Sequence, residues 1–161
     1  TLNGLYEATG RQLVDNHTVV DHALPHGESR QRYKSVLGGK ARGVFRGRVI
    51  VRPDAQKTSA QQASANILLG DGAEIDAKPQ LEIWADDVKC SHGASIGRLD
   101  ENALFYLRSR GIGEAAARAL LTWAFASDLL RHVPDAAVRA AVERHLQARL
   151  PGASGLMEAA S

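Results

Sequence analysis

Residues 1–99 contain short apolar runs that recur at nearly regular intervals and are separated by Gly, Asn, Asp and Pro. Within the runs apolar and polar or small side chains alternate, which is typical of β-strands. If Ile50, Ile67, Ile83 and Ile96 are taken as corresponding positions, the first two steps are almost equal and the third is shorter. Such spacing restricts the fold to a sandwich, a barrel or a solenoid. The clearest runs are Val19-Val20, Gly43–Val51, Asn66–Leu69, Leu81–Trp84 and Val88–Ile96.

The residues between these runs favour the solenoid. Tight hairpin signals are scarce, apart from Asp71-Gly72, so few of the expected strands are joined by two-residue turns. Small residues such as Ala60 and Ala73 recur between the runs, where the bends of stacked turns would need them. The pattern predicts a parallel β-helix, and a sandwich stays open on pattern alone.

From Asp100 onward the pattern becomes helical. Asp100 is a predicted N-cap for a helix through Arg110 that ends at Gly111, and a second helix is predicted from Glu114 to about His132. A third helix is predicted from the spacing of Val138, Val142, Leu146 and Leu150. We therefore expect a mostly β fold with C-terminal α structure: a β-helix over residues 1–99, a helical region over 100–150 and a flexible tail over 151–161.

Composition excludes several classes of protein. The 20 Lys and Arg against 18 Asp and Glu leave a formal charge of only +2, so a dedicated nucleic-acid binder is not expected. One cysteine excludes an internal disulfide framework and a metal site built only of cysteines from one chain. The least polar stretch, residues 119–126, is about a third of a membrane span. With no leader, a cytoplasmic location is expected, and the start at Thr1 indicates a piece of a longer protein.

The most informative motif is Lys89–Ala94, because on a strand Cys90 and His92 would project from the same face. A thiolate beside an imidazole favours zinc, copper or iron–sulfur chemistry, and two ligands are half of a tetrahedral site. The alternatives are a buried structural cysteine with a hydrogen-bonded histidine, and a nucleophile with its base. No oxyanion loop or orienting acid is recognisable nearby, and Asp86 and Asp87 are interpreted as a solvated turn.

The other candidate features have simpler interpretations. His17, His22 and His26 are expected at turns and strand ends, and His132 and His145 on helix surfaces. The basic residues within 30–48 and 108–118 are expected on solvated faces or against an acidic protein partner. No phosphate-binding glycine loop, dinucleotide fingerprint or Gly-x-Ser-x-Gly elbow is present, so the chain is not itself expected to be an ATPase.

Taken in order, several segments resemble the SufB/SufD family of iron–sulfur cluster assembly proteins, and the Cys-Ser-His-Gly-Ala segment resembles its SufD branch. The resemblance implies a right-handed parallel β-helix followed by helices. It also implies pairing with a SufB-like subunit through the β-helix, and docking of a SufC-like ABC ATPase on the helices. The matching segments are residues 21–22, 25–26, 29–34, 44–51, 55–58, 66–69, 79–83, 85–94 and 104–112.

On this resemblance the chain is expected to be a non-catalytic scaffold subunit of a SufBCD complex. His92 matches the family histidine implicated in cluster building, and Cys90 matches the cysteine beside it. They would form a half-site for a transient cluster or iron that a SufB-like partner completes, with no cofactor stably bound to this chain alone. The candidate residues for ATPase docking are Leu104, Phe105, Arg108, Arg110, Leu121 and Phe125.

Three further expectations accompany this interpretation. The long N-terminal portion of the family is missing, so the first rung should expose an unpaired edge, and the fragment is hypothesised to form a homodimer through the surface that would otherwise meet SufB. An acyltransferase-like β-helix with His92 as general base is the alternative enzyme, although the irregular spacing argues against its hexapeptide repeats. A β-helical interaction module without metal chemistry is the third possibility.

Overall fold

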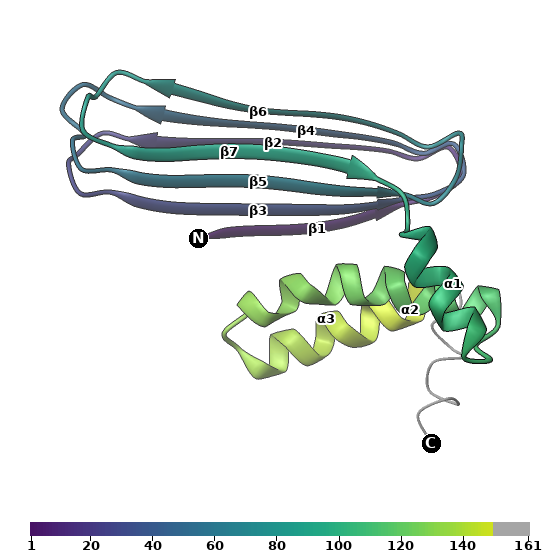
Figure 1. Cartoon of the computed structure of the whole chain (residues 1–161). Coiled ribbons are helices and arrows are strands. Elements are labelled where there is room, and N and C mark those ends of the chain that lie inside the picture. Colours follow the sequence, from purple (N-terminus) through teal and green to yellow (C-terminus); the bar gives the residue numbers. More distant parts are fainter. Residues whose placement is uncertain (150–161) are drawn as a thin grey trace. The chain divides into compact units, whose positions relative to one another are not determined.

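The computed structural model describes residues 1–149. The described residues form two compact units, 1–97 and 98–149, and each is described by itself. The first unit is built of long strands and the second of helices (Figure 1). No helix among residues 1–149 is long and apolar enough to cross a membrane.

The first unit is a parallel β-solenoid of about three turns (Figure 1). Odd-numbered strands form one four-stranded parallel sheet in the order β1-β3-β5-β7, and even-numbered strands form a three-stranded parallel sheet in the order β2-β4-β6. Because successive strands alternate between the sheets, each turn contributes one strand to each. The predicted parallel β-helix is confirmed. The strands are Leu2–Ala8 (β1), Leu13–His22 (β2), Glu28–Leu37 (β3), Arg42–Val51 (β4), Ser59–Leu68 (β5), Glu74–Ile83 (β6) and Lys89–Gly97 (β7).

The register shows that one turn takes about twice the spacing seen in the sequence. Leu13 on β2 pairs with Arg42 on β4, and Arg42 pairs in turn with Glu74 on β6. The steps between apolar runs are therefore half-turns that lead from one sheet to the other. The expectation that Ile50, Ile67, Ile83 and Ile96 correspond was wrong, since Ile83 pairs with Val51 and Ile96 pairs with Asn66.

Small residues occupy the bends, as the sequence indicates. Gly39 has a φ of +65°, and a Cβ there would lie 3.0 Å from the backbone nitrogen of Gly10 in the preceding turn. Only glycine fits such a left-handed, closely stacked bend. Buried alanines line the corners, with Ala8, Ala41 and Ala73 in a cluster at one end of the strands and Ala55, Ala60 and Ala85 in a cluster at the other end.

Between these apolar ends the interior is partly polar. Phe45 is fully buried, and its ring centroid lies 4.7 Å from that of Tyr33. The Ser35 hydroxyl donates to Asn66 Oδ1 at 2.7 Å, and Asn66 Nδ2 donates to the Ser95 carbonyl at 3.0 Å. These bonds join β3, β5 and β7 inside the solenoid, where an unpaired polar group would be costly.

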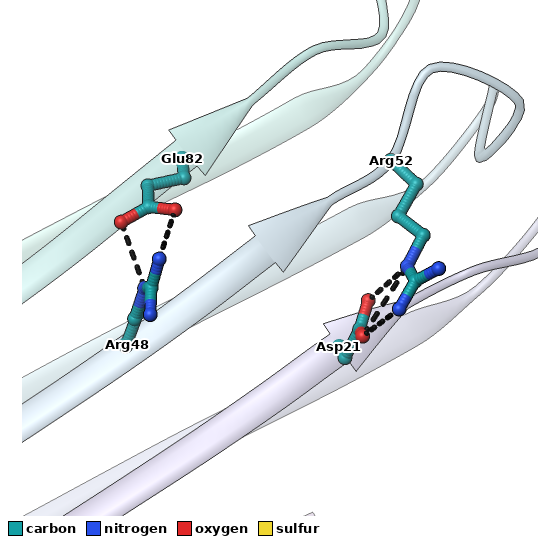
Figure 2. A network of polar contacts seen from close by, with 4 residues as sticks. All are labelled: Asp21, Arg48, Arg52 and Glu82. Atoms are coloured by element: carbon teal, nitrogen blue, oxygen red, sulfur yellow. Dashed lines mark hydrogen bonds and ion pairs between the residues drawn. The ribbon is translucent and has the colours of Figure 1, made fainter.

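Charged pairs join neighbouring turns on the outer surface of the three-stranded sheet. Arg48 on β4 donates to both carboxylate oxygens of Glu82 on β6, at 2.7 and 2.6 Å. Arg52, just after β4, donates to both carboxylate oxygens of Asp21 on β2, at 3.0 and 2.7 Å (Figure 2). Each guanidinium spans one strand spacing, so the pairs connect three consecutive even-numbered strands.

The second unit contains helices α1 (Glu101–Ser109), α2 (Glu114–Ser127) and α3 (Ala136–Arg149), with a 3₁₀ turn, η1 (Asp128–His132), after α2. The predicted caps of the first helix are confirmed, because Asp100 Oδ1 accepts from the backbone N–H of Asn102 at 2.8 Å and Gly111 has a φ of +88°. The second predicted helix is α2 continued by η1. Leu150 and the predicted tail over 151–161 lie outside the described residues.

Candidate functional site

Cys90 and His92 both lie on the inward face of β7, the terminal strand of the four-stranded sheet within the described residues. In the register with β5, Cys90 pairs with Ala60 and His92 pairs with Gln62. Ala60 and Gln62 are buried inside the solenoid. The side-by-side projection predicted for the two side chains follows from this pairing.

The Cys90 thiol is half-buried. It packs against an apolar cluster that includes Val49, Val51 and Ala85. Burial raises the pKa of this thiol, and a backbone hydrogen bond at Ala60 partly offsets that effect. The thiol is therefore protonated at neutral pH, and it must lose its proton before it can bind a metal.

His92, by contrast, is exposed. On β3 and β5, the positions that correspond to His92 are covered by the next strand of the same sheet. No such strand follows β7 in the described part of the chain. The imidazole is therefore accessible from the open end of the solenoid, by which we mean the end bounded by β6 and β7.

The number of ligands limits what the pair can bind. Among residues 1–149 no three His, Cys, Asp or Glu side chains gather closely enough to hold a metal ion. Cys90 and His92 supply one sulfur and one nitrogen donor, a set that suits iron, zinc or an iron–sulfur cluster. A four-coordinate ion held here would need its other ligands from outside the described residues.

The remaining histidines lie on other elements of the fold. His17 contacts Asp15 at 2.8 Å on the outer face of β2, while the buried His22 Nε2 lies 2.8 Å from Ser29 Oγ. His132 and His145 are exposed in the helical unit. The predicted positions are confirmed for His22, the last residue of β2, for His26 in the turn that follows, and for His132 and His145. The prediction was wrong for His17, which lies in the middle of β2.

Comparison with known proteins decides the family. The family model for the SUF system FeS cluster assembly SufBD core domain matches residues 1–125. The chain belongs to the SufBD core-domain family. It is 42% identical over 94% of its length to the iron–sulfur cluster assembly protein SufD of Escherichia coli, of which it covers 36%. It is 42% identical over 87% of its length to the SufBD family protein slr0076 of Synechocystis, of which it covers 31%.

A plant relative extends the match. The chloroplastic protein ABCI7 of Arabidopsis thaliana is 38% identical over 92% of the chain, which covers 32% of that protein. The chain thus spans about a third of the length of these SufBD relatives. The resemblance found in the motifs is confirmed.

The SufBD unit also has a row of inward polar residues that the motifs did not reveal. Gln31, Gln62 and His92 occupy equivalent inward positions on β3, β5 and β7. Each lies one full turn of the solenoid after the one before it. The regular spacing of these three residues is present in the sequence, but it can be recognised only when the number of residues in one turn is known.

A cleft of about 400 Å³ adjoins the same row. It is lined by residues 30–32, 61–63 and 91–93 of β3, β5 and β7, and by none of the three-stranded sheet. Arg30 and Arg32 lie in this lining, and no carboxylate does. The arrangement is compatible with the predicted contact of basic residues in this region with an acidic partner.

The six residues predicted to dock an ATPase differ in exposure. Phe105 on α1 is 74% exposed, and Arg108 and Arg110 are also exposed. Leu104 is buried inside the helical unit, and Leu121 and Phe125 are half-buried. Within the described residues, Phe105 and the two arginines are thus the members of the set with the most accessible side chains.

Proposed function

We propose that this chain is part of a non-catalytic SufD-type scaffold subunit. It would pair with a SufB-like subunit through the open end of the solenoid and dock a SufC-like ABC ATPase on its helices. The observation that carries the proposal is the position of Cys90 and His92, two metal-binding donors on a terminal strand where a partner could complete their ligand set. A cytoplasmic location is part of the proposal.

The open end has the properties of a surface that a partner covers. Ile83 on β6 and Ile96 on β7 occupy inward positions, yet they are 42% and 52% exposed. Both strands are terminal in their sheets within the described residues. Apolar side chains beside unpaired strand edges favour association with another chain.

A shared site would suit transient binding of iron or a cluster as cargo. Cys90 would lose its proton and His92 would offer a neutral nitrogen, so binding would release protons. Two ligands alone hold a metal weakly, whereas ligands from both subunits would complete the coordination. A rearrangement that separates the subunits would then weaken the site and release the cargo.

The proposal of an ATPase-docking surface on the helical unit is supported by a different set of residues. Phe105 and Tyr106 are exposed on α1, and the Arg110 guanidinium lies 5.1 Å from the centre of the Tyr106 ring. Arg108 contacts Glu114 at 3.6 Å. Exposed aromatic side chains with flanking arginines are the composition that protein interfaces favour.

Reconstitution tests the site. The chain, a SufB-like subunit and a SufC-like ATPase are combined anaerobically with iron, sulfide and ATP, and cluster formation is followed by visible absorption. His92→Ala should lose most of the cluster absorption, and Cys90→Ala a smaller part of it. His17→Ala, which removes an exposed histidine from the outer face, is the matched control. Equal cluster yields from His92→Ala and His17→Ala would contradict the proposal.

Capture of the ATPase tests the docking surface separately. Phe105→Ala should weaken capture of the SufC-like ATPase at least tenfold, as loss of a central aromatic anchor does. Val138→Ala on α3, which also truncates an exposed apolar side chain, should leave it unchanged. Undiminished capture by Phe105→Ala would place the docking surface elsewhere.

Without a SufB-like partner, we expect the open end to pair with a second copy of the chain. Light scattering should give a dimeric mass that becomes monomeric in Ile83→Lys or Ile96→Lys. A monomer at high protein concentration would contradict the homodimer.

A further inference from the structure

A series of hydrogen bonds runs through the interior of the solenoid toward β7. Gln31 on β3 and Gln62 on β5 are paired in register, and only 2% and 3% of their surfaces are exposed. Gln62 Nε2 donates to Gln31 Oε1 at 2.5 Å, and Gln31 Nε2 donates to the Thr18 hydroxyl on β2. The two carboxamides are thus bonded to each other along the stacking direction, and Thr18 anchors the first of them.

This series of hydrogen bonds ends at Gln62, one strand before the open end. Gln62 Oε1 is buried and has no hydrogen-bond partner. A buried acceptor without a donor costs free energy, so such an atom calls for an explanation. The next position in the row, on the far side of Gln62 from Gln31, is His92.

The carboxamide of Gln62 is confined by its surroundings. A Cβ added at Gly47 on β4 would lie 2.1 Å from Gln62 Nε2 and 2.9 Å from its Cδ. The absence of a side chain at Gly47 therefore makes the space that the carboxamide fills. With Nε2 held by Gln31, the orientation that leaves Oε1 as the free acceptor is maintained.

We propose that Gln62 is a positioning residue for His92, and that its Oε1 accepts a hydrogen bond from one ring N–H of the imidazole. In a stack of carboxamides each oxygen accepts from the next turn, and here the next turn supplies a histidine. The bond places the proton on the nitrogen that faces Gln62. The other nitrogen keeps its lone pair and faces the open end, as a histidine that binds a metal requires.

That this tautomer would bind a metal rests on the proposed function. The hydrogen bond between Gln62 and His92 does not depend on that function. Histidines that bind metals usually donate their second N–H to a neighbouring acceptor, which fixes the ring. In the SufBD solenoid this acceptor would come from the preceding turn and be held by Gln31 and Thr18. A bound water could satisfy Gln62 Oε1 instead, and the experiment below separates the two.

The test is the tautomer ratio of His92 in the whole chain, measured by long-range ¹H–¹⁵N correlation at about pH 8.5, where an ordinary imidazole is neutral. The His92 signals are assigned by their loss in His92→Ala. We expect one tautomer to dominate, and Gln62→Met to lower the ratio by roughly three- to tenfold, the range that one hydrogen bond supports. Gln62→Glu, which keeps an acceptor oxygen, should retain the dominant tautomer.

Gln61→Met is the matched control, because the neighbouring glutamine faces outward and is exposed. If Gln62→Met fails to fold, Gln62→Ala decides, since it also removes the acceptor oxygen and places a smaller side chain beside Gly47. An unchanged ratio in the folded variant would overturn the proposal and leave the water as the partner. Because no cluster is needed, this result is distinct from the failure of His92→Ala to affect assembly.

Discussion

Cys90 and His92 lie on the same face of β7, but the thiol packs against the core of the solenoid whereas the imidazole is exposed. Adjacency on a strand therefore does not give the two proposed ligands the same surroundings. In the proposed site a metal would reach the exposed His92 directly, while binding by Cys90 would require loss of a proton that burial retains. In that proposal the imidazole would be the first ligand and the thiolate would follow.

Alkylation of Cys90 should show the effect of burial directly. The chain has one cysteine, so the rate of iodoacetamide labelling reports this thiol alone. Because the pKa of Cys90 is raised, the pH at which labelling reaches half its maximal rate should lie above the value of about 8.5 that an ordinary thiol gives. The unfolded chain in urea is the control with an ordinary pKa. A midpoint at or below that of the unfolded chain would show that the thiol is not desolvated.

The two ion pairs in Figure 2 should make stability depend on pH at the acidic end. Hydrogen bonds from Arg52 and Arg48 lower the pKa values of Asp21 and Glu82 respectively. A carboxylate with a lowered folded pKa stabilises the fold above its unfolded value, about 3.9 for Asp and 4.3 for Glu. This contribution is lost as the pH falls through the lower folded values. Stability should therefore decline below about pH 4.

Replacement of one carboxylate isolates this contribution. Glu82→Gln should lower the melting temperature at pH 7, and the difference from the parent chain should shrink as the solution is acidified or as salt is raised. Glu74→Gln, the control, removes a carboxylate from the same strand that makes no ion pair with an arginine in residues 1–149. It should leave the melting temperature nearly unchanged. A deficit in Glu82→Gln that stays constant far below the pKa of an ordinary glutamate would contradict the assignment.

Because much of the interior is polar, the few large apolar side chains should contribute a large share of the stability of the solenoid. Phe45 fills the space between the sheets against Tyr33, at a centroid distance of 4.7 Å. Phe45→Ala should reduce the free energy of unfolding by about 3–5 kcal/mol, measured by urea denaturation of the solenoid. Leu13→Ala, which truncates an exposed side chain on β2, should change it by less than about 0.5 kcal/mol. Similar losses in both variants would mean that Phe45 is not central to the core.

The strands differ in how well local sequence predicts them. Residues 43–51 alternate clearly because their inward side chains are apolar or glycine, and this stretch became β4. β3 was not predicted, because its inward positions include Ser29, Gln31 and Ser35. These polar residues are favourable inside only when the next turn supplies partners such as Asn66. That pairing connects positions a full turn apart, so no local window contains it.

The candidate site was also only partly predictable from local sequence. Cys90 and His92 could be proposed as a pair because two residues at alternate positions of one strand share a face regardless of the rest of the fold. Gln62 could not be connected with them until the register placed it beside His92. The spacing expected from the isoleucines had aligned half-turns, which lie on opposite sheets, and it therefore concealed the row.

The caps of α1 could be predicted because they depend on a few neighbouring residues, and they can be tested in the same local way. Asp100 Oδ1 accepts from the backbone N–H groups of Asn102 and Ala103, at 2.8 and 3.4 Å. Loss of such a cap costs about 1 kcal/mol, so Asp100→Ala should speed amide hydrogen exchange in α1 roughly fivefold. Asp86→Ala, which removes an exposed aspartate from a bend in the solenoid, should leave exchange in α1 unchanged. If both variants exchange like the parent chain, the Asp100 carboxylate does not stabilise the start of this helix.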